Sequence, residues 1–339
     1  MKKLFKLFTL ASTLLLLQTK LIAQDDDKDK DKGDRDKKYE FVKTKSVNKS
    51  YNVSSSDKLN IDNQFGKVEI HTWDRNEIKV DVSIEVSSNK ESYAQKLIDN
   101  ISVSDNQSGR EISFKTNMAN NNRGDDSRDT KSNMHINYSI SMPAGNPLRV
   151  SNQFGATTIP DMRGEVDINS KFGSLTTGTL SNIKTVNVEF GKAKFESVAN
   201  GTVTVKYSKA DFAKLVGNIK LNLEFCGSTR VNLDNSLTGL DVKASYSSVN
   251  LRPTGDLSAS YNISTSFGSL KNNTSIKFNG DGDDDGDSHG PKFDHTYSGK
   301  SGSGSVPVKV NTSFGKVVLG EPGPDDMKRE KNKNKSKES

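Results

Sequence analysis

The sequence predicts an all-β protein: a parallel β-solenoid of 17–21-residue coils, preceded by an irregular β-rich N-terminal region that carries one helix. Three observations predict this class. A short phrase recurs at a nearly constant step, apolar residues alternate on both sides of it, and small residues interrupt the alternation at regular places. Together they describe strands that turn at fixed corners and stack on one another.

The recurring phrase is an aromatic residue followed by a small residue. It is clearest in residues 186–195, at Phe190 and Gly191. From Phe154 to Phe267 successive aromatics are 18, 18, 17, 18, 21 and 21 residues apart. A nearly constant step of this size indicates stacked structural repeats. The aromatic positions are Phe65, Phe154, Phe172, Phe190, Tyr207, Phe225, Tyr246, Phe267 and Phe314.

Alternating apolar residues flank each aromatic. Val186 and Val188 precede the aromatic of one repeat, and Ala193 and Phe195 follow it. Strict alternation is the period of a strand with one buried face. Counted from the aromatic, the apolar residues lie at even positions before it and at odd positions after it. A strand cannot change its buried face in this way without a bend, which predicts a corner at the small residue, where a glycine such as Gly191 has positive φ. A second corner is expected near the middle of most repeats, at Gly164, Gly178, Gly201, Gly217, Gly239 and Gly255.

Two architectures share this parity. In a parallel solenoid the aromatics stack inside, about 4.8 Å apart. In an antiparallel meander each aromatic lies at the tip of a hairpin, where Asn, Asp or Gly is preferred. A series of exposed aromatic tips is unfavourable in water. The sequence therefore favours the solenoid, with Phe172, Phe190, Tyr207 and Phe225 pointing inward.

The order of segments along the chain follows from composition. Residues 39–147 are β-rich but irregular, and 148–319 hold the regular repeats. One helix is expected near 90–100, because Ser88 and Glu91 form a capping box ahead of apolar residues at helical spacing. An Asp- and Gly-rich excursion, 279–305, leaves one coil, and 320–339 are a disordered charged tail.

The amino-terminal segment has the order of a secretory signal peptide. Lysines precede an apolar run, and a short c-region follows it to Ala23 and Gln24, so 1–23 is expected to be cleaved. An uncleaved anchor is the alternative. Residues 24–38 are a charged, disordered tether. The sequence thus predicts an exported protein of the periplasm, outer envelope or cell surface of a Gram-negative-type bacterium, without a transmembrane segment after cleavage.

The charge balance excludes a nucleic-acid partner. The formal net charge is +6, and four of the lysines lie in 1–23, which leaves +2 on the mature chain. The single cysteine excludes an internal disulfide. Cys226 stands between Phe225 and Gly227 and is interpreted as a one-residue bulge, with Thr229 and Val231 facing inward; a free reactive thiol is the alternative.

The sharpest candidate for a bound ion is the acidic stretch with Asp281, Asp283, Asp285 and Asp287. Alternate carboxylates with glycine resemble the front half of a calcium loop, but position twelve is Lys292 rather than a bidentate Glu. A solvated acidic loop is the competing interpretation. Apart from this weak calcium hypothesis, no cofactor is expected.

Residues 63–73 and 136–144, together with the serial Phe-Gly corners, resemble the bacterial putative-adhesin domain of unknown function, a family of exported repetitive β-solenoids. The resemblance covers roughly residues 59–319. It implies an envelope or surface location and adhesion, and it brings no catalytic residues with it.

Two functions follow as hypotheses. The first is a non-enzymatic envelope or surface module that presents a repetitive polar face to a glycan, a protein or the cell envelope. The second is a β-helical carbohydrate-active enzyme, a polysaccharide lyase or hydrolase, which would need carboxylates that converge in an outer groove.

Overall fold

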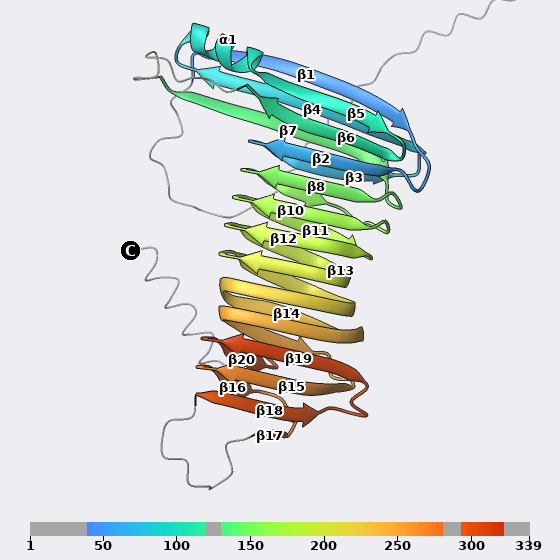
Figure 1. Cartoon of the computed structure of the whole chain (residues 1–339), viewed down its shortest axis with the longest axis vertical. Helices are drawn as coiled ribbons and strands as arrows, with labels where there is room; N and C mark the ends of the chain where they lie inside the picture. Colours follow the sequence, from blue (N-terminus) through green and yellow to red (C-terminus); the bar gives the residue numbers. More distant parts are fainter. Residues whose placement is uncertain (1–38, 120–129, 281–292, 322–339) are drawn as a thin grey trace, which may run out of the picture. The chain divides into compact units, whose positions relative to one another are not determined.

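The computed structural model describes residues 39–119, 130–280 and 293–321, all within one compact unit, Tyr39–Ser339. These residues form strands and a single helix, which confirms the all-β prediction (Figure 1). The predicted signal peptide, tether and charged tail lie outside the described residues, apart from the first positions of the tail.

In the repeats, an extended stretch precedes each aromatic and another follows it, and each stretch pairs in parallel with its equivalent in the next coil. In the later coils these stretches merge, so that residues 209–253 form one strand through the corners at Phe225 and Tyr246. The strands before the aromatic align Val150, Ile168, Val186 and Val203 in one row. Those after the aromatic align Thr157, Leu175, Ala193 and Ala210. The strands are β8 (Leu148–Gln153), β9 (Thr157–Ile159), β10 (Val166–Lys171), β11 (Ser174–Leu180), β12 (Ile183–Glu189), β13 (Lys192–Lys206) and β14 (Lys209–Pro253).

The N-terminal region is largely antiparallel, so the strands are mixed and the prediction of a parallel fold is corrected to that extent. β4 pairs antiparallel with both β1 and β7, and β5 pairs antiparallel with β6. The loop between β5 and β6 has only two residues, Gly109 and Arg110, and a connection this short permits only an antiparallel hairpin. The elements are β1 (Phe41–Asn52), β2 (Lys58–Gln64), β3 (Val68–Trp73), β4 (Glu77–Ser88), α1 (Glu91–Asp99), β5 (Ile101–Ser108), β6 (Glu111–Met118) and β7 (Ser132–Pro143).

The two regions join through β2 and β3, which continue the rows of the repeats. β2 pairs in parallel with β8 on one side and with β6 on the other. β3 pairs in parallel with β9 and β7. The phrase around Phe65 therefore belongs to the first coil of the stack.

At the other end, the spatial order departs from the sequence order. β19 lies between the end of β14 and β15, and β20 lies between the last part of β14 and β16. β18 pairs antiparallel with β15 and with β17, so residues 294–300 of the predicted excursion form a sheet strand. The strands are β15 (Ala259–Ser266), β16 (Ser269–Asn272), β17 (Phe278–Gly280), β18 (Asp294–Lys300), β19 (Val306–Ser313) and β20 (Lys316–Leu319).

The apolar core runs through the middle of the coils. Val186 and Val188 before the corner, and Phe195 after it, are buried as their alternation predicts. Phe195 stacks on Phe212 of the next coil inside the core, with ring centroids 4.7 Å apart. Each buried aromatic or aliphatic side chain of this size contributes roughly 1.5–3 kcal/mol through burial.

The helix begins differently from the capping-box prediction. Lys90 is the N-cap residue and its side chain makes no capping hydrogen bond. Ser88 lies in β4 and is buried, with its hydroxyl donating to the Lys131 carbonyl. Glu91 instead pairs with Lys43 Nζ on β1, at 2.9 Å. Both side chains of the predicted capping box therefore have partners outside the helix, and Ser88 Oγ also accepts a local hydrogen bond from Lys90 N at 3.2 Å.

Candidate binding surface along the aromatic column

The aromatic of every corner has a left-handed backbone conformation. Its φ ranges from 48° at Tyr246 to 62° at Phe65. The prediction that Gly191 would have positive φ is wrong, because the left-handed residue is Phe190, with φ of 55°. A left-handed residue redirects the chain, so the ring turns out of the inward row that the preceding strand would give it.

The glycine after each aromatic is required for a different reason, which is close approach between coils. A Cβ on Gly191 would lie 2.0 Å from the carbonyl oxygen of Gly173, and one on Gly173 would lie 1.9 Å from that of Gly155. Where serine replaces this glycine at Ser208, its hydroxyl forms hydrogen bonds with backbone atoms. Ser208 Oγ donates to the Lys206 carbonyl at 2.7 Å and accepts from Gly191 N at 2.9 Å.

The corner aromatics lie on the outside of the coils, which overturns the prediction that they stack inside. Phe172 and Phe190 are each 48% exposed, and Tyr207 is 47% exposed. Their exposure does not make them isolated tips, because each inner ring of the series is covered on both faces by the rings of adjacent coils. The column consists, in spatial order, of Phe65, Phe154, Phe172, Phe190, Tyr207, Phe225, Tyr246, Phe314, Phe267 and Phe293.

The rings of this aromatic column are evenly spaced. Neighbouring centroids are 4.7–5.0 Å apart, and the corner rings are within 10° of parallel. The spacing follows that of paired strands, so the column is roughly 45 Å long. Since stacked rings cover one another's faces, the column presents ring edges to solvent, and the edge of an aromatic ring is its electropositive part.

Charged residues line both sides of the column, and the net charge differs between the two sides. On the side that precedes the aromatic, Lys171 pairs with Glu189 at 3.1 Å and Lys206 pairs with Glu224 at 3.0 Å. On the side that follows it, exposed Lys192 lies opposite exposed Lys209, in a row that Ser174 continues. The first side is neutralised by its ion pairs, and the second is basic beside Phe190 and Tyr207.

Cys226 occupies the small-residue position of its corner, and its thiol is buried. Gly227, with φ of 68°, follows it, and Thr229 and Val231 are fully buried, as the bulge interpretation predicts. Burial raises the pKa of the Cys226 thiol, so the thiol is protonated near neutral pH. A protonated, buried thiol is a poor nucleophile, which favours the structural interpretation over the reactive one.

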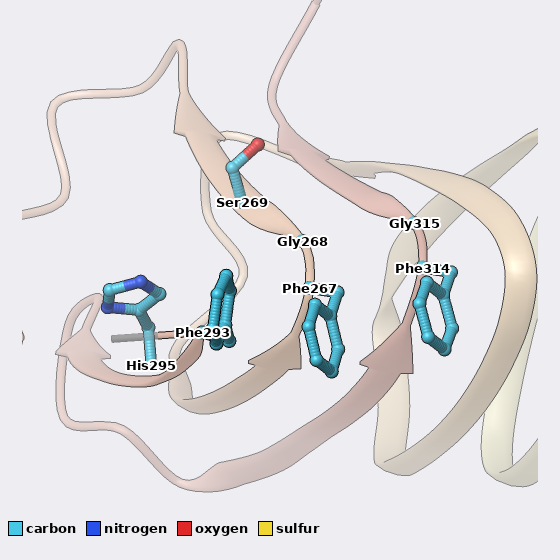
Figure 2. Close-up of a pocket in the computed structure, with 7 residues that line it drawn as sticks. All are labelled: Phe267, Gly268, Ser269, Phe293, His295, Phe314 and Gly315. Carbon is cyan, nitrogen blue, oxygen red and sulfur yellow. The ribbon is translucent and has the colours of Figure 1, made fainter. Parts of the chain in front are cut away.

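An open hollow of about 550 Å³ lies at the last rings of the column. Figure 2 shows Phe314, Phe267 and Phe293 side by side, with His295 beyond Phe293. Gly268, Ser269 and Gly315 complete the lining. The hollow thus combines the last rings of the column with an imidazole and a hydroxyl.

The candidate calcium ligands Asp281, Asp283, Asp285 and Asp287 lie outside the described residues. Within residues 39–119, 130–280 and 293–321, no three His, Cys, Asp or Glu side chains are grouped to hold a metal ion. In the same ranges no helix has the length and apolar character needed to cross a bilayer.

No family model matches the chain, and no curated protein does. Among solved structures, a "putative cell adhesion protein" from Clostridium sporogenes is 14% identical, with a TM-score of 0.26, over 83% of this chain and 100% of that one. A "putative adhesin" from Bacteroides fragilis is 10% identical, with a TM-score of 0.35, over 81% of this chain and 97% of that one. A "putative lipid binding protein" from Parabacteroides distasonis is 9% identical, with a TM-score of 0.31 and the same coverages.

Two of these three structures are named for adhesion, the class that the sequence resembles. At such identities and TM-scores, the likeness carries no conclusion about the fold or the partner of this chain.

Proposed function

We propose that the protein is an exported, non-enzymatic envelope or surface protein that binds an extended, anionic glycan along the aromatic column. The coils that display the column are interpreted as a parallel β-solenoid closed at both ends by antiparallel strands. The observation that carries the proposal is the even row of half-exposed rings, each held at the surface by a left-handed corner.

The regular spacing supports an extended partner. Ring centroids recur every 4.7–5.0 Å, so a chain lying along the column would meet the same group at each coil. Many weak, identical contacts add through effective concentration, and a single short ligand would gain little from them. A polymer or a surface therefore suits the geometry better than a small molecule.

The chemistry of the exposed groups supports an anionic, oxygen-rich partner. Inner rings such as Phe190 have both faces covered, so a sugar ring cannot stack on them. Their electropositive edges instead favour oxygen atoms. Lys192 and Lys209 stand next to two of these rings and would pair with carboxylate or sulfate groups.

The signal-peptide pattern of residues 1–23 supports export. The alternative, a β-helical carbohydrate-active enzyme, would use the same surface with carboxylates placed beside it. It remains a competing proposal, and turnover assays separate the two.

The decisive experiment measures binding of the purified chain to a soluble polyuronate and to a neutral glucan of similar length by titration calorimetry. The variant Lys192→Gln with Lys209→Gln should bind the polyuronate at least tenfold more weakly, and the affinity of the parent should fall as salt rises. The matched control is Lys184→Gln with Lys220→Gln, two exposed lysines farther from the corner.

A ring variant, Phe172→Ser with Phe190→Ser, tests the column itself, provided that its circular dichroism matches the parent. The proposal is contradicted if the Lys192→Gln with Lys209→Gln variant and the ring variant bind the polyuronate as tightly as the parent does. It is also contradicted if the parent prefers the neutral glucan. Release of new sugar ends by the parent chain would favour the enzyme instead.

A further inference from the structure

The last coil of the chain lies between two coils that precede it in the sequence. Along the aromatic column, Tyr246 stacks on Phe314 at 4.8 Å, and Phe314 stacks on Phe267 at 5.0 Å. Figure 1 shows the same order in the strands, with β19 between β14 and β15. The C-terminal coil, Val306–Leu319, therefore fills a slot that earlier parts of the chain leave open.

Both walls of the slot hold the coil by continuous parallel pairing. Residues 308–313 of β19 pair with residues 240–245, and the whole of β19 pairs on its other side with β15. Val308, for example, lies between Leu240 and Tyr261. β20 lies in the same way between residues 249–251 and β16. The slot thus recognises the coil by backbone pairing and by the phrase that all repeats share.

The connection into the slot is short and hydrogen-bonded to its rim. Residues 301–305 cross the start of β15, where Ser301 and Ala259 exchange two backbone hydrogen bonds of 2.8 and 3.1 Å. Gly304 N donates to Ser258 Oγ at 3.1 Å. Gly302 and Gly304 have φ of 54° and 74°, so the connection depends on two left-handed glycines.

We propose that the C-terminal coil is an exchangeable element through which two copies of this chain join, each copy placing Val306–Leu319 in the slot of the other. Every contact made within one chain can be made between two, because the walls contain no residue of the coil itself. A slot without its coil exposes two parallel strand edges, and unpaired edges attract strands. The partner is therefore a second copy, which already carries a segment of matching register.

This inference does not depend on the proposed glycan. Its test uses full-length chains in a Cys226→Ser background, so that the only thiols are those introduced. One chain carries Lys243→Cys and the other Asn311→Cys, positions that face each other across the wall of the slot. Directly paired residues have the Cα separation that a disulfide needs.

The two chains are unfolded together, refolded as a mixture and oxidised mildly. We expect a disulfide-linked dimer on a non-reducing gel, in at least tenfold excess over the control mixture. The control pairs Asn169→Cys with Asn187→Cys, which face each other across two coils that do not exchange.

Equal yields in the two mixtures, including no linked dimer in either, would overturn the proposal. A single chain with both Lys243→Cys and Asn311→Cys must form its internal disulfide, which verifies the geometry. If those substitutions prevent folding, the pair Asp241→Cys and Lys309→Cys probes the same wall. Circular dichroism of each chain establishes that it is folded before mixing.

Discussion

At the scale of single residues, the aromatic at each corner combines a strained backbone with favourable stacking. Phe190 has φ of 55° and stacks on Phe172 and Tyr207, each at 5.0 Å. A left-handed conformation costs an L-residue roughly 1–2 kcal/mol, and glycine avoids this cost. Phe190→Gly should therefore be more stable than Phe190→Ala by about 1 kcal/mol, although both lose the ring. Urea unfolding of the two variants checks this, and an alanine variant as stable as the glycine variant would contradict it.

Two phenylalanines of one repeat, five positions apart, should respond very differently to truncation. Phe195 is fully buried, whereas Phe190 is 48% exposed. Phe195→Ala should lower the free energy of unfolding by about 3–5 kcal/mol, the usual range for a buried aromatic. Phe190→Ala should cost less, because its ring edge is already in solvent. The prediction fails if urea unfolding gives the larger loss for Phe190→Ala.

The corner glycine should be intolerant of a side chain, even though its φ is not left-handed. A Cβ on Gly191 would lie 2.0 Å from the Gly173 carbonyl oxygen, which holds the backbone of the adjacent coil in place. Gly191→Ala should therefore lower the melting temperature more than Gly109→Ala. Gly109 is the control because it has φ of 57° and nothing within 4 Å of the added Cβ. A smaller loss for Gly191→Ala would show that adjacent coils separate easily.

The corners could be located from the sequence, but their conformation could not. Alternation places Val188 and Ala193 inside on either side of the corner, and it requires a turn between them. It does not say whether Phe190 or Gly191 adopts positive φ, because either residue can redirect the chain. We expected the glycine on conformational grounds, whereas the crowding that requires glycine comes from the neighbouring coil and leaves no local signal. Whether the Phe190 ring faces the core or solvent depends on which of the two residues has positive φ.

At the scale of elements, a polar contact fastens β1 to the hairpin of β5 and β6. Tyr51 Oη donates a short hydrogen bond to the carboxylate of Asp105, and Lys49 Nζ lies 3.4 Å from the same carboxylate. The hydrogen bond from Tyr51, with the charge and hydrogen bond of Lys49, lowers the pKa of Asp105. Burial, together with Asp105, raises the pKa of Tyr51 to about 12.

These shifts give the contact a defined pH window. A lowered carboxyl pKa stabilises the fold while the group is ionised, and this stability is lost as the pH falls below the ordinary value of 3.8 through the folded pKa. A raised tyrosine pKa stabilises the fold below the ordinary value of 10.0, and this stability is lost as the pH rises through about 12. Tyr51→Phe should therefore cost about 1 kcal/mol at neutral pH, the value of one hydrogen bond.

The difference between Tyr51→Phe and the parent should shrink below pH 3.8 and above pH 10. Urea unfolding across this pH range measures it. Tyr207→Phe is the control, because it places on the column the residue that most other corners contain. A constant difference from acid to alkaline pH would show that the contact with Asp105 is unimportant.

Strands with a clear alternation of apolar residues could be predicted from the sequence, whereas the strands that pair with them could not. The strands around Val186 and Val203 follow directly from alternation. The insertion of β19 beside β14 does not, because the phrases at Phe267 and Phe314 are equivalent and either could stack on Tyr246. Register is specified locally by the phrase, but the order of equivalent coils is decided by long-range packing. The spatial order of the last coils therefore departs from their order in the sequence.

At the scale of the whole molecule, stability should be divided among adjacent coils. Each repeat pairs only with its two neighbours in the stack, so removing one whole coil brings two compatible surfaces together. Deleting residues 173–190 would join Phe172 directly to Gly191. In the parent, Ile168 and Val203 both pair with Val186, so the deletion would set them opposite each other. Likewise Ile159 and Phe195 both pair with Thr177 in the parent and would become neighbours. The deletion also brings Lys171 opposite Lys206, so it is combined with Lys171→Glu.

We expect this deletion variant to fold with the β-type circular dichroism of the parent and to melt cooperatively, at a temperature several degrees lower because one interface between coils is lost. The control deletes residues 173–182, about half a coil. It leaves Val186 and Val188 four and six positions after Phe172, where the side chains of a coil face solvent, and it breaks the aromatic column. This control should not fold. If both deletions unfold the protein, its stability is global rather than divided among coils, and if both fold, the register between coils is not fixed by the phrase.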